Sequence, residues 1–465
     1  MPARARPPLD TALAWAGAMT VLLAVLVGWL PQGPFAPRPI DPPCTVEPEP
    51  PPATPGPATR GGLLYRRAFL GDEPVRSPWI EAVGVTLSAE PAEPGAGLRL
   101  RGAAGGHLRI APESTLPMAL AERMAVTVYA PKPIRVELEL VDGITGARLL
   151  RPLALVEGSQ RLDAALVDFH YERGRVALAS RAVRWGLHFV DAGELELRAV
   201  ELLGDGSTSA DDRLLATLRE TFDDPGQVHV HRRGAFALLT DAPALDVRAV
   251  LDALDGMHAH TRAVLPSMPP LRSVVPLLVF RDDAAYRRFW RRTSARVGRT
   301  LAPLSADEGY TWQGIATASF DDRYGAVRPT YVHEAHHALF ERAWDLAAQR
   351  SWLFEGLAVL EQLPWSRQDL APVYRRGLRR ADAMSHLREL LDGRPIATER
   401  YWQATLFVRW LLSDPGRTAA LDAAMVEMAA RGSTELAPLA PRDFGSDLRA
   451  LGREFWSWAW VSFGI

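Results

Sequence analysis

The sequence predicts a multidomain chain with an N-terminal transmembrane helix, an all-β sandwich of jelly-roll type and a C-terminal α+β domain. Three observations lead to this prediction. Residues 11–30 lack charge, residues 61–204 alternate between hydrophobic and polar side chains, and the hydrophobic period becomes helical after about residue 205. With 465 residues, of which 48% are hydrophobic, the chain has enough apolar material for more than one packed core.

The charge balance and the cysteine content exclude several classes of protein. The 53 basic and 55 acidic residues give a net charge of −2, so the chain has no overall positive field for a nucleic-acid backbone. The single cysteine, Cys44, cannot form an intramolecular disulfide. We therefore expect no nucleic-acid partner and no disulfide framework.

Residues 1–30 are predicted to form a cytoplasmic stub and a signal anchor. The charge-free run of residues 11–30 spans about 30 Å as a helix, which matches the hydrocarbon thickness of a bilayer. Arg4 and Arg6 precede the run, so we expect the N-terminus inside the cytoplasmic membrane and the rest of the chain outside, in the periplasm or at the cell surface. A cleaved signal peptide is the alternative, although the run is longer than a typical signal segment and has no small-x-small cleavage site.

Residues 31–60 contain twelve prolines and are predicted to be a stiff spacer. In residues 61–204, period-two runs such as 98–101 and 135–140 must bury their apolar faces against a second sheet. This rhythm and an early tryptophan resemble galactose-binding-like β-sandwich modules, which implies carbohydrate as a candidate ligand. The aromatic residues able to stack on a sugar, none of which is assigned to a ligand site, are Trp79, Tyr129, Tyr171 and Trp185.

Residues 205–465 combine short strands with long amphipathic helices. Strands are expected at residues 227–231 and 274–280. Helices are expected over residues 244–265, 329–349, 352–363, 401–412 and 449–463. This pattern predicts an α+β domain that ends in helices.

The helix expected at residues 329–349 contains the pattern His333-Glu334-x-x-His337. A helix places the two histidines one turn apart on one face, where both imidazoles can bind one metal ion. Glu334 lies one step around the helix, from which a carboxylate reaches an activated water without binding the ion itself. The pattern predicts a site for one Zn²⁺ ion.

The run Trp352-Leu-Phe-Glu-Gly-Leu-Ala supplies a third ligand. Glu355 lies eighteen positions after His337, a distance that lets a second helix fold back against the first. Gly356 and Ala358 would permit the close helix approach that a shared ion demands. A His₂Glu set leaves the fourth tetrahedral position for water, as catalytic zinc requires.

These motifs resemble those of the gluzincin metallopeptidases, in which HExxH is followed by a glutamate on the next helix. Over about residues 209–465 the chain is similar to bacterial peptidase-MA-like and DUF1570-type proteins. The resemblance implies a zincin-like fold, zinc ligands His333, His337 and Glu355, and Glu334 as the general base. It also implies a downstream residue that stabilises the oxyanion; the candidates are Tyr401 first, then Tyr374 and His386.

The resemblance further implies that residues 309–319 form an edge strand that pairs with an extended peptide. The Gly-x-Met-Glu-Asn signature of M1-type aminopeptidases has no counterpart in residues 301–328, so aminopeptidase activity is not implied. His336 lies about 100° from His337 around the helix, and we interpret it as a packed or supporting residue instead of a fourth ligand.

The function predicted from the sequence is that of a membrane-anchored zinc peptidase. One alternative is an inactive zinc-binding protein that is tethered to the membrane and acts through the β-sandwich, and another is a purely structural tether. Glu334 favours the enzyme, because structural zinc needs only its ligands. Arginines in residues 287–292 and 375–380 are interpreted as solvated surface, and the late tryptophans Trp456, Trp458 and Trp460 as core.

Overall fold

The computed structural model describes residues 63–69, 80–88, 97–111, 116, 118, 121–171, 174–204, 210–271, 273–297, 309–347, 350–366, 369–380 and 387–464. The predicted anchor, the predicted spacer, Trp79 and His386 lie outside these residues. Every described residue belongs to one compact unit, Thr59–Ile465. Among the described residues, no helix is both long enough and apolar enough to cross a membrane.

The predicted all-β segment is a large antiparallel β domain. Its strands are β1 (Leu63–Ala68), β2 (Ile80–Ser88), β3 (Leu98–Ile110), β4 (Arg123–Ala130), β5 (Ile134–Asp142), β6 (Arg148–Leu155), β7 (Gly158–Ala165), β8 (His170–Tyr171), β9 (Gly174–Arg175), β10 (Ala182–Phe189) and β11 (Gly193–Leu203). All of them except β9 join one sheet in the order β7-β4-β11-β3-β10-β5-β6-β8, with β1 on β11 and β2 on β3.

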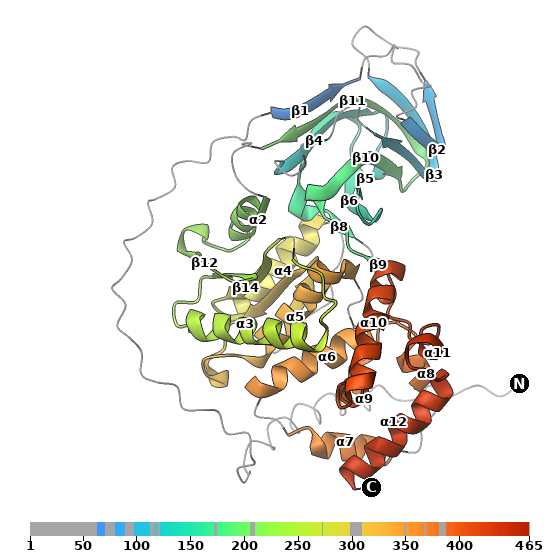
Figure 1. Ribbon diagram of the computed structural model, residues 1–465. Helices are drawn as coiled ribbons and strands as arrows, with labels where there is room; N and C mark the ends of the chain where they lie inside the picture. The colour runs from blue at the N-terminus through green and yellow to red at the C-terminus, as the bar shows by residue number, and fades with distance from the viewer. Residues whose placement is uncertain are drawn as a thin grey trace, which may run out of the picture. The chain divides into compact units, whose positions relative to one another are not determined.

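The sheet folds over on itself because its long strands exchange neighbours part-way along. Residues 98–102 of β3 pair with β11, whereas residues 107–110 pair with β10. The two halves of the sheet then enclose one core (Figure 1). Buried residues alternate along both halves, as in Met124, Val126 and Val128 of β4 and Val136, Leu138 and Leu140 of β5.

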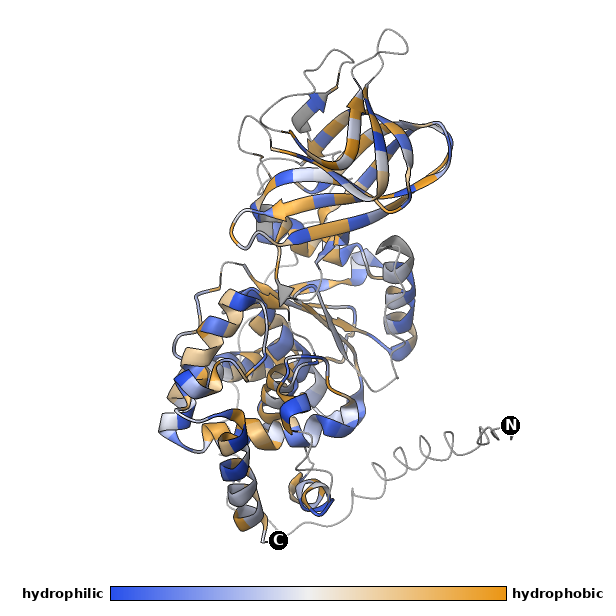
Figure 2. Ribbon diagram, turned by 90° about the vertical axis from the view of Figure 1, so that its right-hand side faces the viewer, coloured by the Kyte–Doolittle hydropathy of each residue, from blue (hydrophilic) through white to orange (hydrophobic). Residues whose placement is uncertain are grey.

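Figure 2 shows the corresponding alternation of hydrophobic and hydrophilic residues along these strands. Residues that face one core at every second position are what the period-two pattern predicts. The prediction of an all-β domain is therefore confirmed.

The C-terminal part is built on a five-stranded mixed sheet. Its strands are β12 (His229–Arg233), β13 (Phe236–Thr240), β14 (Val275–Phe280), β15 (Tyr310–Trp312) and β16 (Ile315–Ser319), in the order β12-β13-β14-β16-β15. β13, β14 and β16 run parallel, and β12 and β15 are antiparallel strands at the two edges.

Helices cover both faces of this sheet. The described helices of this part of the chain are α2 (Ala210–Arg219), α3 (Val247–Val264), α4 (Asp283–Val297), α5 (Pro329–Trp344), α6 (Trp352–Gln362), α7 (Ala371–Leu378), α8 (Leu387–Leu390), α9 (Tyr401–Leu412), α10 (Pro415–Arg431), α11 (Ala440–Asp443) and α12 (Leu448–Phe463), of which α2 to α5 pack on the sheet. α3 and α5 share a core with one set of sheet residues, including Leu238 and Val279. α2 and α4 share a core with the alternate set, including Leu239 and Phe280.

The predicted helices agree with α3, α5, α6, α9 and α12, with one difference at a helix end. α5 ends at Trp344, five residues earlier than predicted, because Asp345 adopts the left-handed conformation at φ 51°. The following residues form β17 (Leu346–Ala347), which pairs with β9 of the β domain. Local periodicity could not show this end, since the strand partner lies far away in the sequence.

Candidate metal centre

Helix α5 presents the two predicted imidazoles. Pro329 is its first residue and needs no backbone hydrogen bond there, so the helix is established one turn before His333. The Nε2 atoms of His333 and His337 lie 3.1 Å apart. The two Nε2 atoms therefore face each other and are the ring nitrogens that could meet a shared ion.

Glu355 reaches the same point from α6. Its Oε2 atom lies 3.4 Å from Nε2 of His333 and 3.6 Å from Nε2 of His337. Within the described residues these three side chains are the one group of potential ligands whose donor atoms all lie within 4.8 Å of one another. The structure thus brings together all three predicted metal ligands.

The three donor atoms fit a tetrahedral ion. Bonds of about 2.0–2.1 Å place neighbouring ligand atoms of tetrahedral zinc about 3.3 Å apart. The observed separations of 3.1, 3.4 and 3.6 Å lie on both sides of that value. Two imidazole nitrogens and one carboxylate oxygen form a donor set found at catalytic zinc sites, where the fourth coordination position is left for water or substrate.

Gly356 has a different neighbour from the one predicted. A Cβ atom at this position would lie 2.6 Å from Cγ2 of Val408 and 2.9 Å from the carbonyl oxygen of Ala404, both on α9. Gly356 therefore permits the close approach of α6 to α9, and its predicted role in the contact with α5 is wrong. The contact with α9 fixes the helix that carries Glu355.

Burial and mutual attraction perturb the ionisation of the triad. Burial raises the pKa of Glu355, but the two imidazoles outweigh it and hold this pKa well below its ordinary value. Burial lowers the pKa of His337, but Glu355 outweighs it and the net direction is upward. The carboxylate is consequently ionised, as a metal ligand must be.

Glu334 lies beside the triad without joining it. Its Oε2 atom accepts a 2.8 Å hydrogen bond from the hydroxyl of Thr311 on β15. Burial raises the pKa of Glu334, and this effect exceeds the opposing effects of His333 and His337. A carboxylate with a raised pKa is suited to take up a proton near neutral pH.

Two residues that fix this carboxylate were not predicted from the sequence. Thr311 is one, through its hydrogen bond. The other is Gly309, where a Cβ atom would lie 2.4 Å from Cγ of Glu334. Both belong to the segment predicted as an edge strand, and that prediction was their one sequence signal.

The predicted edge strand is present. β15 and β16 form an antiparallel hairpin, and β15 is the last strand of the sheet in the described part of the chain. Gln313 and Gly314 make the two-residue turn with φ of 55° and 67°. The hairpin is thus placed directly against Glu334.

Of the two described candidates for stabilising an oxyanion, Tyr401 and Tyr374, Tyr401 contacts the triad. It is the first residue of α9, and burial together with its hydrogen bond to Glu355 raises its pKa well above the usual value. Tyr374 instead packs on Phe463 of α12, with ring centroids 5.3 Å apart, and burial raises its pKa to about 12. His336 is fully buried and packs against Phe340, outside the metal group.

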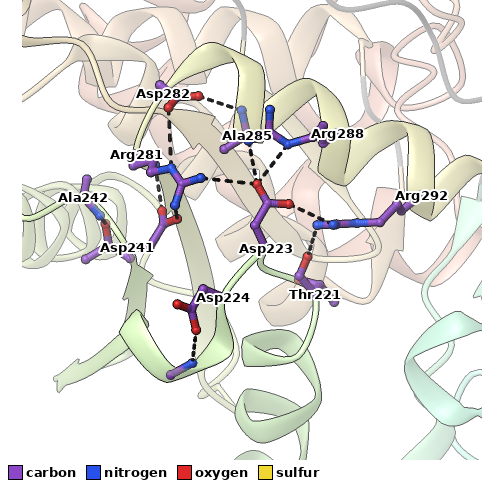
Figure 3. A network of polar contacts seen from close by, with 12 residues as sticks. Thr221, Asp223, Asp224, Asp241, Ala242, Arg281, Asp282, Ala285, Arg288 and Arg292 are labelled. Atoms are coloured by element: carbon purple, nitrogen blue, oxygen red, sulfur yellow. Dashed lines mark hydrogen bonds and ion pairs between the residues drawn. The ribbon is translucent and has the colours of Figure 1, made fainter.

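Carboxylates pair with arginines of residues 287–292, the first of the two arginine-rich segments noted in the sequence. Asp223 lies 2.6 Å from Arg288, 2.8 Å from Arg292 and 3.6 Å from Arg281, in the network drawn in Figure 3. Charges matched in this way leave little attraction for an outside anion. The arginines of α7 are exposed.

The three tryptophans near the C-terminus lie partly in the core and partly at the surface. Trp456 is buried on α12, and Trp458 packs against the same core. Trp460 is 36% exposed. The prediction of core packing is therefore confirmed for the first two and wrong for Trp460, because the outer side of α12 faces solvent at that position.

Three of the aromatic residues considered for sugar stacking are described. Trp185 is buried in the core of the β domain, and Tyr171 is buried beside Glu341. Tyr129 is 38% exposed, with the guanidinium of Arg198 over its ring. Sugar stacking needs an open ring face. Trp185 and Tyr171 do not provide one.

Comparison with known proteins adds little to this picture. No family model and no curated protein matches the chain. Among solved structures it is similar to "BiXyn10A CBM1", with 9% identity, 30% of this chain and 97% of the other covered, and a TM-score of 0.23. It is also similar to the family 11 carbohydrate-binding module of the cellulase Lic26A-Cel5E of Clostridium thermocellum, with 9% identity, 31% of this chain and 96% of the other covered, and a TM-score of 0.22.

A third similarity is to an exo-beta-agarase, with 12% identity, 45% of this chain and 31% of the other covered, and a TM-score of 0.25. Two of these three solved structures are carbohydrate-binding modules. The similarities are too low to carry an argument about ligand or activity.

Proposed function

We propose that this chain is a membrane-anchored, zinc-dependent peptidase of the gluzincin type. One observation carries the proposal: His333, His337 and Glu355 converge at ligand distances while Glu334 is held separately beside them by Thr311. Three ligands alone would suffice for structural zinc. A carboxylate that is kept close to the ion but outside its ligand set is the additional group that hydrolysis needs.

Each residue has a distinct task in this proposal. Zinc, when bound, supplies Lewis acidity and makes a nearby water more acidic. Glu334 accepts a proton from the water as its oxygen bonds to the peptide carbonyl carbon, and then donates that proton to the amine nitrogen as the C–N bond breaks. The Tyr401 hydroxyl turns from Glu355 to the substrate and donates its hydrogen bond to the carbonyl oxygen as negative charge develops there.

The proposed substrate is a peptide in extended conformation. β15 is the last strand of its sheet in the described part of the chain and lies beside Glu334, where an extended peptide could add to the sheet. Residues 11–30 would hold the enzyme at the outer side of the cytoplasmic membrane, and the proline-rich spacer would carry it away from the lipid.

The proposal is tested by metal analysis and peptide-library hydrolysis on the wild-type chain and Glu334→Gln. We expect one zinc ion in both proteins and hydrolysis in the wild type alone. Zinc in both without hydrolysis in either would favour the inactive binding protein. Absence of stoichiometric zinc from the wild type would refute the metal site.

A second pair of variants tests the ligand set. Glu355→Gln should lose zinc, because an amide oxygen binds it far more weakly than a carboxylate. Glu361→Gln is the matched control, since Glu361 is a buried carboxylate on the same helix that bonds to His260 at 2.8 Å. It should keep zinc.

A further inference from the structure

The β domain reaches the candidate active site through one buried cluster. The hydroxyl of Tyr171 on β8 donates a 2.7 Å hydrogen bond to Oε2 of Glu341, one turn after His337 on α5. The same oxygen accepts a 2.7 Å hydrogen bond from the backbone N–H of Gly314. The backbone of Tyr171 also pairs with the side chain of Gln313, donating to Oε1 at 2.8 Å and accepting from Nε2 at 3.2 Å.

Gln313 and Gly314 are the turn of the β15–β16 hairpin. Gln313 has a positive φ, a conformation that costs free energy for a residue with a Cβ atom and persists where the surroundings hold it. Tyr171 and Glu341 hold it from one side, and Arg342 adds a 2.7 Å hydrogen bond from Nε to the carbonyl oxygen of Gly314.

The hairpin carries this restraint to the general base. Thr311 lies two residues before the turn and donates the hydrogen bond that orients Glu334. A strand of three residues is short enough that a shift of its turn moves the whole strand. The hairpin thus connects Tyr171, at its turn, with Glu334, at Thr311.

The β domain also holds the end of the metal-binding helix. Asp345 accepts a 3.0 Å hydrogen bond from Arg181, and its carbonyl oxygen accepts a 2.8 Å bond from the N–H of Val176. Ala347, which follows in β17, is part of the β domain's hydrophobic core. The chain that leaves α5 toward Glu355 is thus anchored in the β domain.

We propose that the β domain is a working part of the hydrolytic site, in which Tyr171 is a positioning residue that fixes the β15–β16 hairpin and thereby orients Glu334. The catalytic consequence rests on the proposed peptidase function, whereas the restraint on the hairpin does not. Misplacing a reacting group by about 1 Å can cost up to about a hundredfold in rate. Loss of one hydroxyl from the cluster is expected to cost about tenfold in kcat.

The test compares Tyr171→Phe with Leu187→Val in the full chain. Leu187 is buried in the β domain's core on β10, which β5 and β6 separate from β8 in the sheet, so removing one methylene there loosens the core without touching the hairpin. Zinc content, kcat, KM and hydrogen exchange of residues 309–319 are measured for each. Tyr171→Phe should keep its zinc and its KM, lose about tenfold in kcat and exchange faster in the hairpin. Leu187→Val should match the wild type in kcat and hairpin exchange.

Gln313→Gly is a second, independent variant. It removes both contacts to the backbone of Tyr171 and favours the positive φ, so the turn itself is not strained. It should change kcat and hairpin exchange in the same direction as Tyr171→Phe. Should both variants behave like Leu187→Val, the inference is overturned.

The inference and the proposed function can fail separately. If the wild-type chain hydrolyses no peptide, the proposed function fails. Hairpin exchange then decides the restraint alone: faster exchange in Tyr171→Phe and Gln313→Gly supports it, and unchanged exchange overturns it.

Discussion

The buried carboxyl of Glu341 is expected to make the stability of the protein depend on pH in an unusual direction. Burial raises its pKa from 4.5 to about 7, although hydrogen bonds from Tyr171 and Gly314 work against this rise. Both bonds end on the same oxygen, Oε2. In Glu341→Gln an amide oxygen can therefore keep both bonds while the buried charge is removed.

The magnitude follows from the difference between the two pKa values. One pKa unit corresponds to about 1.36 kcal/mol. A rise in the pKa of Glu341 from 4.5 to about 7 therefore lowers the free energy of unfolding by about 3 kcal/mol once the carboxyl is ionised. Between these values the folded state of this carboxyl binds more protons than the unfolded state, and the free energy of unfolding falls as the pH rises. The loss is absent below pH 4.5 and complete above about pH 7.

Glu341→Gln should therefore be more stable than the wild type by up to about 3 kcal/mol near pH 8 and nearly equal to it near pH 4.5. Urea unfolding of both proteins in EDTA measures this, because the chelator removes the pH dependence of metal binding. Glu454→Gln, at an exposed site on α12, is the control and should change stability by less than about 0.5 kcal/mol at either pH. A stability difference between Glu341→Gln and the wild type that is the same at both pH values would refute the reasoning.

Three further predictions concern the packing around Glu334 and Glu355. Thr311→Val should keep zinc but lower kcat about tenfold or more, whereas Thr311→Ser, which retains the hydroxyl, should restore it; equal rates would exclude the hydrogen bond as the cause. Gly309→Ala should also lower kcat with zinc retained, because the added Cβ atom meets Glu334. The control is Gly256→Ala on α3, where the Cβ atom enters open space; it should stabilise the protein by about 1 kcal/mol in thermal unfolding. Gly356→Ala should cost about 1–3 kcal/mol in the same measurement through its clash with α9, and an unchanged midpoint would contradict that packing.

The convergence of the three candidate metal ligands was predictable because its information is local. His333 and His337 are four residues apart, and a helix alone brings them together. Glu355 follows on the next helix, and a short connection restricts where that helix can pack. Tyr401 was a prediction from resemblance, and the structure places its hydroxyl on Glu355.

The parts that failed depend on packing between distant segments. Nothing in the periodicity of residues 329–349 shows that the helix stops at Trp344. The residues that follow pair with β9, which lies far away in the sequence. Gly356 carries the same composition signal whether α5 or α9 lies against it, and only packing decides between them. The exposure of Trp460 likewise depends on which side of α12 the other helices leave open.

The sequence by itself determined the three candidate metal ligands, the general base candidate and the change from a period-two to a helical chain at about residue 205. Tertiary structure alone decided that Tyr171 meets Gln313 across 142 positions and Glu341 across 170 positions, joining the β domain to the candidate active site. Periodicity and spacing report on neighbours along a helix or strand, whereas contacts at such separations arise only when independently formed elements pack together.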